Sequence, residues 1–425
     1  MCAVDVAWDT PRSESAFRNG RARAYALRMR TRPAAVTALA LLGLPLAGLL
    51  ALSACGGDDV ATVPDGGGPR DLGSGRTDLG PDFDAGPRTD LGPDVDAGPR
   101  PDSGVPAGAC ARPMFPADAP WNQEITGAAV DAESAAVIAH LADVGWGFGR
   151  MQIDFSFHVQ CATGAPMRTF TPTDDFYDGE CDVAPVPVPV GGHIEGESGY
   201  ACESDGDCHL IVIDPGTQRL YEQWRVNIVG DVYEGGCLAV WDLSRTPPAS
   251  NRGERCTSAD AAGLPITALL FDADEVAADD IRHAIRFILP NDRIREAIYV
   301  HPATHGTGGG SGGGASGGAN SPPYGARLRL RSDYPLASLP NDYARAVARA
   351  MQRYGIVLSD GGNIALTAAD DENTTAKWDF DTDNRADATG LGPRDLDMIR
   401  PSDFAMVEGG MRYNWRDAPG CVLNP

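Results

Sequence analysis

The cysteines constrain the fold of this chain more than any other feature of its sequence. Two of the ten cysteines fall within the first 55 residues, and the other eight lie in residues 110–425. An even number of cysteines in a domain that folds in an oxidising compartment indicates disulfide bonds, in this case four. The eight are Cys110, Cys161, Cys181, Cys202, Cys208, Cys237, Cys256 and Cys421.

The sequence alone leaves the pairing of these cysteines open, because eight cysteines can combine in many ways. If cysteines close in sequence pair with each other and the remaining two join the ends of the domain, one set of four disulfides is predicted. It consists of Cys161–Cys181, Cys202–Cys208, Cys237–Cys256 and Cys110–Cys421. No two cysteines are separated by two residues, which argues against a zinc ribbon or a thioredoxin-like motif.

The first 55 residues have the features of an export signal. Five arginines between positions 21 and 32 precede an apolar run, 34–52, and the run ends in Leu52-Ser53-Ala54-Cys55. This order of basic, apolar and small residues is typical of a secretory signal peptide, and a start at Met29 would give it ordinary proportions. A membrane-spanning helix is the alternative, because the run is about long enough to cross a bilayer. Pro45 and the cysteine favour cleavage.

The tetrapeptide Leu52-Ser53-Ala54-Cys55 resembles the lipobox of bacterial lipoproteins. The resemblance implies cleavage before Cys55 and lipidation of this cysteine, so that residues 1–54 form the signal peptide. The mature chain is then expected in the cell envelope, outside the cytoplasm. We expect its lipid to attach it to a membrane, most simply the outer membrane.

Residues 55–109 are expected to form a disordered tether behind the lipid anchor. Asp, Gly, Pro, Arg, Thr and Ser dominate the segment, and residues 77–88 recur at 89–100 with one substitution. Such a composition cannot bury enough apolar surface to offset the entropy of the chain. A solvated spacer is the simplest interpretation, and calcium binding by its Asp-x-Asp pairs is the alternative.

The acidic composition excludes one class of partner. The chain has 59 acidic and 35 basic residues and a formal net charge of −24. Binding of nucleic acid needs clustered cations to meet the phosphates, so we do not expect a nucleic-acid partner. Residues 110–425 are long enough to form a sizeable core, as one extracytoplasmic domain.

Apolar periodicity predicts mainly strands in this domain. Apolar and polar residues alternate over 153–159 and over 327–331. A continuous apolar run, 210–213, is followed by a turn and then by a second strand, 220–226, as in a β-hairpin.

Helices are fewer. One is predicted at 342–354, with Asn341 as its N-cap, and another at 134–142. We therefore expect a mainly β fold with a few helices (α+β), in which disulfides staple a β-sandwich or jelly-roll-like core.

Seven segments of the domain resemble, in the same order, a broad set of secreted bacterial proteins. The segments are 207–214, 221–224, 257–265, 281–287, 302–305, 322–330 and 354–362. The resemblance covers most of residues 115–410 and implies a shared extracellular fold. It carries over no catalytic residue. The stretches 202–208 and 306–318 depart from the pattern and are expected to be loop elaborations.

Glu222 and Trp224 are the first candidates for chemistry. Residues two apart in a strand share a face, and a carboxylate beside an indole suits a cleft that binds sugar. Cleavage of a glycosidic bond needs a second carboxylate, about 5–5.5 Å away for retention or 6.5–9.5 Å for inversion. Asp260 and Asp360 are the candidates for it. The alternative is a core tryptophan beside a solvated glutamate.

Histidines supply the remaining catalytic candidates. His209, His283 and His305 could act as acid, base or orienting group, because imidazole titrates near neutral pH. The alternative is that each of these histidines is half-buried, hydrogen-bonded and purely structural. His301 and His305 have a zinc-like spacing, but the intervening Pro302 disfavours the helix that this spacing needs. The side chains expected to contact substrate are Tyr221, Trp224 and Arg327.

One acidic loop predicts a possible structural calcium ion and no other cofactor. Its ligands would be Asp379, Asp381, Asp383 and Asp387, which match the first part of a calcium-binding loop. Gly390 stands where such a loop has its bidentate glutamate. A solvated acidic loop is the alternative.

These features lead to one hypothesis with two alternatives. The hypothesis is a lipid-anchored envelope protein that cleaves a polysaccharide by glycosidase-like or lyase-like chemistry. Glu222 would be the acid/base, Asp260 or Asp360 its partner, and His283 or His305 the orienting group. The alternatives are a non-catalytic carbohydrate-binding or adhesion module and a structural envelope lipoprotein. Substrate, linkage and oligomeric state stay open.

Overall fold

The computed structural model describes residues 110, 112, 114–173, 179–204, 206–309, 314–378 and 390–424. The expected signal peptide, the lipidation site Cys55, the tether and the calcium-loop residues Asp379, Asp381, Asp383 and Asp387 all lie outside the described residues. The described residues form seventeen strands and three α-helices. The expectation of a mainly β fold with a few helices is therefore confirmed.

The largest sheet has six strands and combines parallel with antiparallel pairs. In spatial order they are β1 (Ile153–Phe157), β15 (Leu366–Ala369), β11 (Ile285–Leu289), β14 (Ile356–Gly361), β13 (Arg327–Leu330) and β16 (Phe404–Met406). The pairs β1–β15 and β11–β14 are parallel, and the others are antiparallel. Parallel pairing is absent from an antiparallel jelly roll, and strand alternation alone did not predict it.

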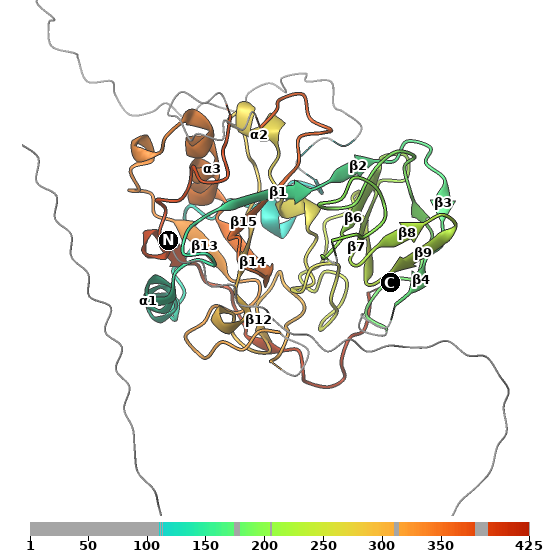
Figure 1. Ribbon diagram of the computed structural model, residues 1–425. Helices are drawn as coiled ribbons and strands as arrows, with labels where there is room; N and C mark the ends of the chain where they lie inside the picture. The colour runs from blue at the N-terminus through green and yellow to red at the C-terminus, as the bar shows by residue number, and fades with distance from the viewer. Residues whose placement is uncertain are drawn as a thin grey trace, which may run out of the picture. The chain divides into compact units, whose positions relative to one another are not determined.

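A second sheet has four strands. They are β10 (Leu238–Asp242), β7 (Arg219–Gln223), β6 (Leu210–Asp214) and β2 (Val159–Cys161). The hairpin predicted from the sequence is confirmed, because β6 and β7 pair antiparallel with Leu210 opposite Gln223. Only His158 separates β1 from β2, and Figure 1 shows these two strands as one long ribbon that passes from the first sheet to the second.

Three smaller sheets complete the β-structure. One contains β4 (Thr171–Pro172), β9 (Val232–Gly235) and β8 (Asn227–Val229); the others pair β3 (Met167–Arg168) with β5 (Val186–Pro187) and β12 (Ile298–Tyr299) with β17 (Tyr413–Asn414).

Two of the three α-helices of the described residues lie where the sequence predicts helices. These two are α1 (Ser134–Val144) and α3 (Asp342–Arg353), whereas α2 (Ala273–Ala277) was not predicted. The side chain of Asn341 accepts a hydrogen bond from the backbone N–H of Ala344 at 2.8 Å, so the predicted N-cap of α3 is confirmed. The buried face of α3, with Val347 and Met351, packs against the six-stranded sheet (Figure 1).

The four-stranded sheet separates two hydrophobic cores. Ile211 and Ile213 of β6 face the larger core, which continues under the six-stranded sheet. Leu210 and Val212 face a smaller core. A strand that is covered on both faces needs apolar residues at consecutive positions, which explains the unbroken run at 210–213.

Four disulfides join the domain, but three of the predicted pairings are wrong. The bonds are Cys110–Cys161, Cys181–Cys237, Cys202–Cys208 and Cys256–Cys421, of which only Cys202–Cys208 was predicted. The rule of local closure fails because backbone contacts bring distant segments together. The backbone N–H of Asp182 donates to Leu238 at 2.8 Å and so places Cys181 beside Cys237.

The disulfides also indicate where the domain folds. Four bonds of this kind persist in an oxidising environment, so the domain is extracytoplasmic. In the part of the chain that the structure describes, no helix has the length and the apolar composition needed to span a bilayer.

The bond with the longest loop should contribute most to stability. Cys256 and Cys421 are 165 residues apart, whereas Cys202 and Cys208 are 6 apart. Loop-closure entropy predicts that replacing the first pair with serine lowers the free energy of unfolding by about 5 kcal/mol, and replacing the second pair by about 2 kcal/mol. Urea unfolding of the two double variants measures both values. Equal losses, or a larger loss for C202S/C208S, would contradict this account.

Candidate functional site

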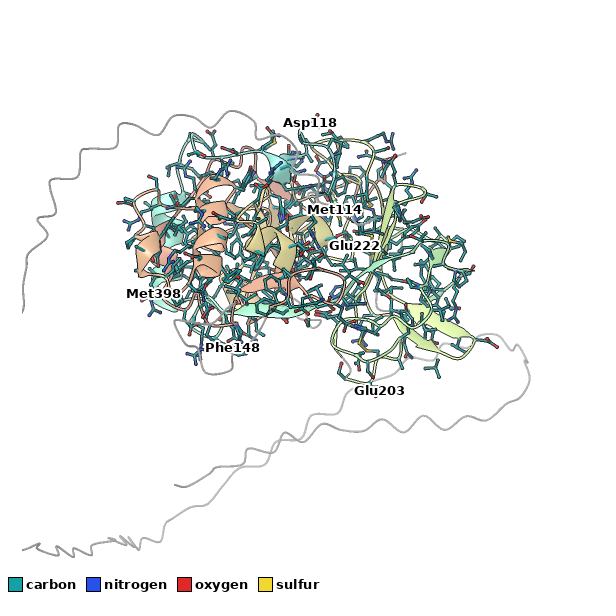
Figure 2. The ribbon with its side chains drawn as sticks, turned by 90° about the horizontal axis from the view of Figure 1, so that it is seen from above. Met114, Asp118, Phe148, Glu203, Glu222 and Met398 are labelled. Carbon is teal, nitrogen blue, oxygen red and sulfur yellow. A yellow bond between two sulfur atoms is a disulfide. The ribbon has the colours of Figure 1, made fainter. Side chains whose placement is uncertain are left out.

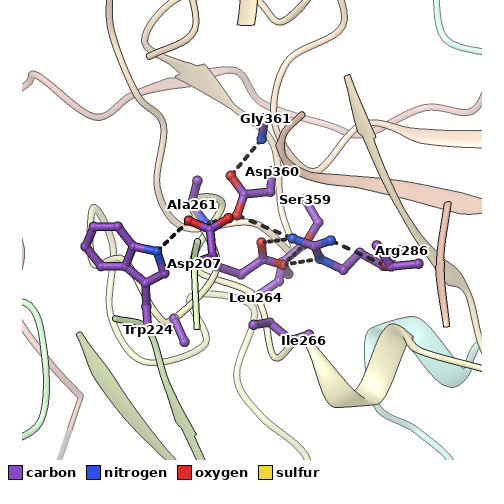
Figure 3. Close-up of polar contacts among 12 residues, drawn as sticks. Asp207, Trp224, Ala261, Leu264, Ile266, Arg286, Ser359, Asp360 and Gly361 are labelled. Carbon is purple, nitrogen blue, oxygen red and sulfur yellow. Dashed lines mark hydrogen bonds and ion pairs between the residues drawn. The ribbon is translucent and has the colours of Figure 1, made fainter. Parts of the chain in front are cut away.

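The candidate site is built around a buried ion pair. Arg286 of β11 lies against Asp260, with Nη2 2.9 Å from Oδ1 and Nε 3.2 Å from Oδ2. The Asp260 side chain is fully buried and that of Arg286 is almost so. The same Nη2 lies 3.3 Å from Oδ2 of Asp360, so the guanidinium bridges two carboxylates (Figure 3).

Sheet pairing and one tight turn position these three side chains. β14 runs parallel to β11, and a register shift at Phe287/Ile288 places Asp360 opposite Ile288. The turn that carries Asp260 is held by Ser258, whose Oγ accepts from the Asp260 N–H at 3.0 Å and donates to the Leu264 carbonyl at 2.7 Å. The turn also docks on β14, because the Ala262 N–H donates to the Ser359 carbonyl at 3.0 Å.

Asp260 and Asp360 differ in what they can do. Both oxygens of Asp260 are engaged by Arg286, and Oδ2 also accepts a short hydrogen bond from the Ser359 hydroxyl. The Asp360 side chain keeps 26% of its surface exposed. Its Oδ1 accepts from the Gly361 N–H at 2.7 Å, and its Oδ2 from the Ala261 N–H at 3.4 Å. Asp360 is thus the member of the pair that faces outward.

The protonation of Asp360 follows from this arrangement. Burial and the adjacent Asp260 carboxylate raise the pKa of Asp360 well above its ordinary range, although Arg286 acts in the opposite direction. Two carboxylates this close resist ionising together. Asp360 therefore keeps its proton to a higher pH than an ordinary aspartate does.

A second buried pair supports the turn. Nδ1 of His209 lies 2.6 Å from Oε2 of Glu195, and Nε2 lies 3.1 Å from the Ala259 carbonyl. Burial alone acts to lower the pKa of His209, but the Glu195 carboxylate outweighs it and raises that pKa to about 9. His209 is thus charged at neutral pH and donates from both nitrogens, one of them to the residue before Asp260.

An aromatic ring joins the two pairs. The Phe157 ring lies 5.3 Å from that of His209, and the Arg286 guanidinium lies 5.2 Å from the Phe157 centroid. At the outer side, Nε1 of the half-buried Trp224 donates to Oδ1 of the exposed Asp207 at 2.9 Å (Figure 3). An aromatic ring and a carboxylate therefore accompany the charged cluster at the surface.

The structure brings together Asp260 and Asp360, which the sequence offered as alternative partners of Glu222, and His305 contacts the turn that carries Asp260. Nδ1 of His305 donates to the Ala261 carbonyl at 2.8 Å, while the N–H of the same Ala261 faces Asp360. Burial lowers the pKa of His305 to about 4, so its ring is neutral at pH 7. The contact is the hydrogen-bonded, buried arrangement that the sequence analysis gave as the structural alternative for this histidine.

Glu222 lies elsewhere, which corrects the expectation of an exposed Glu–Trp face. Its side chain is fully buried on β7, and Figure 2 shows it in the interior, whereas Glu203 lies at the surface. It accepts hydrogen bonds from Trp241 at 2.9 Å, from the Ile266 N–H at 3.1 Å and from the N–H and hydroxyl of Thr267 at 2.7 and 2.6 Å. The main core covers Glu222, so no substrate reaches it, whereas Trp224 at the edge of the same face is only partly buried.

Three other predicted residues also make structural contacts. His283 is buried between the Ala284 carbonyl, 2.8 Å from Nδ1, and Glu275, 3.3 Å from Nε2. Arg327 donates to three backbone carbonyls, and burial lowers its pKa to about 10. Tyr221 is buried in the smaller core. The geometry gives none of them a place beside Asp360.

Sequence reasoning missed Arg286 and Glu195. Arg286 had a usable signal, because it is the only charged residue in the strand Ile285–Leu289. A charge inside an apolar strand has to be paired, and it points to a buried carboxylate. Glu195 carried no such signal, since it lies in an irregular segment.

Comparisons with protein-family models, with curated proteins and with solved structures found no match. The interpretation of the site therefore depends on its own geometry.

Removal of Arg286 should destabilise the domain, because the Asp260 carboxylate would stay buried without its counter-charge. For Arg286→Ala we expect the free energy of unfolding to fall by about 3–5 kcal/mol. The control is Arg349→Ala, because Arg349 pairs with Asp279 at the surface and such pairs contribute about 1 kcal/mol or less. Chemical denaturation of both variants provides the test. Similar losses in the two variants would show that the Arg286–Asp260 pair has no special weight.

Proposed function

We propose that this domain is an extracytoplasmic hydrolase that cleaves an extracellular glycan, with Asp360 as the proton donor. The observation that carries the proposal is a carboxyl group, 26% exposed, whose pKa is raised by burial and by the carboxylate beside it. Glycosidic cleavage needs such an acid, because the departing sugar oxygen must be protonated. Trp224 offers the aromatic surface on which a sugar ring can stack.

The roles within the site follow from accessibility. Asp260 is a positioning residue, because it is enclosed by Arg286 and Ser359 and acts on Asp360 through its charge. Arg286 sets the distance between the two carboxylates. Asp207, exposed and oriented by Trp224, is our candidate for the second carboxylate that handles water or the sugar.

A pocket elsewhere on the domain favours a second candidate function, a carbohydrate-binding module without catalysis. The pocket has a volume of about 420 Å³, and its lining includes Trp241, Arg219, Arg245, Arg252 and Asp182. Arginine and aspartate side chains can hydrogen-bond to sugar hydroxyls. In this case the protein would bind a glycan and leave it intact.

Replacement of Asp360 separates the two functions. We expect Asp360→Asn to lower the rate of reducing-end release from a panel of neutral and acidic polysaccharides by at least about 100-fold, because the amide cannot donate the proton. Wild-type turnover should fall as pH rises through the raised pKa of Asp360, since the acid must be protonated. Asp333→Asn, a change at an exposed aspartate, serves as the matched control.

The fold of the Asp360 variant can be checked in the same series. A group whose pKa is raised by folding contributes stability at low pH. This contribution is lost as pH rises through the pKa of the folded state. Asp360→Asn cannot ionise beside Asp260, so its melting temperature relative to wild type should increase with pH. Undiminished cleavage by this variant would remove the catalytic role, and glycan binding by wild type without cleavage would favour the second function.

The proposed location follows from the leader sequence. We propose that Cys55 carries a lipid that holds the mature chain at the envelope, most simply at the outer membrane, with residues 56–109 as its tether. Cells grown with an alkyne-labelled fatty acid should label the wild-type protein and the Cys2→Ala variant but not Cys55→Ala. Label on Cys55→Ala, or a mature chain that begins elsewhere, would contradict the anchor.

A further inference from the structure

A second cluster of side chains lies outside the carboxylate site. His158, His193, Asp370 and Glu372 each offer one ligand atom, and these four atoms all lie within 4.8 Å of one another. Two imidazoles and two carboxylates form a donor set that zinc commonly takes in proteins. Another group, Glu197 with Cys202 and Cys208, has no such capacity because the two cysteines are joined in a disulfide.

Strand pairing builds this cluster from segments far apart in the chain. β1 and β15 are parallel neighbours with Phe157 opposite Ala369, so the residues that follow them, His158 and Asp370, emerge side by side. The Asp370 N–H donates to the Phe157 carbonyl at 2.8 Å, which fixes their separation. Glu372 follows two residues later, and its N–H donates to Oδ1 of Asp370 at 3.2 Å.

His193 lies in the segment between β5 and β6, and a hydrogen bond to its backbone carbonyl holds it in place. Nε2 of Gln160, on β2, donates to the His193 carbonyl at 2.9 Å. The imidazole of His193 then stacks on that of His158, with ring centroids 3.6 Å apart. The cluster therefore joins the β1–β2 crossing, the end of β15 and the segment that leads to Glu195.

Each imidazole has one ring nitrogen directed at a carboxylate oxygen of the cluster. Nδ1 of His193 lies 3.0 Å from the Ile194 carbonyl, and its Nε2 lies 3.2 Å from Oε1 of Glu372. Backbone carbonyls hold metal-binding histidines in this way and fix the tautomer. Nδ1 of His158 faces Oδ2 of Asp370 at 2.6 Å. In each pair a cation would replace the proton between nitrogen and oxygen.

We propose that His158, His193, Asp370 and Glu372 bind one zinc ion. His158 is buried, whereas the Glu372 side chain is 60% exposed, so the site has a closed inner side and an outer side from which the ion enters. The bound ion would tie the loop of His193 to the ends of β1 and β15. This inference stands apart from the proposed glycan cleavage and needs none of its residues.

Metal content and affinity of the purified chain test the proposal. We expect the protein, stripped with a chelator and titrated with Zn²⁺, to bind one equivalent and to melt at a higher temperature with zinc than without it. Glu372→Gln changes a side chain that is 60% exposed, and it should weaken zinc binding by at least about tenfold. His193→Gln should weaken it further.

The matched control is a histidine–carboxylate pair outside the cluster. Nε2 of His301 lies 2.7 Å from Oε1 of Glu254, and His301→Gln should leave zinc affinity and stoichiometry unchanged. Absence of zinc binding by wild type at micromolar concentrations would overturn the proposal. Wild-type affinity in Glu372→Gln and His193→Gln would overturn it equally, and the cluster would then consist of two His–carboxylate pairs that fasten the strand ends.

Discussion

The buried contact between Arg286 and Asp260 is the constraint on which the candidate site depends. A guanidinium inside a sheet is tolerated only when a carboxylate meets it with good geometry, because both charges have lost their water. Asp260 can meet it only from a turn that is itself held by hydrogen bonds to Ser258 and docked on β14. One ion pair therefore fixes the turn, two neighbouring strands and the carboxyl group of Asp360.

The distribution of charge around this pair explains why Asp360 is special. Two positive groups, Arg286 and His209, lie among the carboxyl groups of Glu195, Asp260, Asp360 and Asp154. Burial raises the pKa of Glu195, whereas the contacts with His209 lower it. The pKa is lowered overall, and Glu195 therefore stays ionised. Asp260 is neutralised by its two contacts with Arg286. Asp360 is the partly exposed carboxyl group of the pair, and burial together with the adjacent Asp260 keeps its pKa raised.

Local features of the fold could be predicted from the sequence, and long-range features could not. The β6–β7 hairpin and the Asn341 cap of α3 each depend on residues close together in the chain, and both predictions are confirmed. The parallel pairs and three disulfides depend on contacts between distant segments, about which periodicity carries no information. A distant backbone contact, such as that between Asp182 and Leu238, decides which cysteines meet.

The same distinction applies to the candidate site. Alternation correctly placed Glu222 on one face of its strand, but it could not indicate that a second layer covers this face. Asp260 was a candidate from a turn and Asp360 from the end of a strand, whereas their pairing with Arg286 follows from the parallel pairing of β11 with β14. Residue type and local position thus selected two of the acids, and the sheet determined their environment.

The two clusters described above share one structural support, the strand β1. Phe157, the last residue of β1, contacts the ring of His209 and the guanidinium of Arg286. The next residue, His158, is the first member of the histidine cluster. Consecutive residues of a strand point to opposite faces, so one short segment can serve both clusters without direct contact between them. Since β1 also continues into β2, both clusters lie beside the crossing that links the two larger sheets.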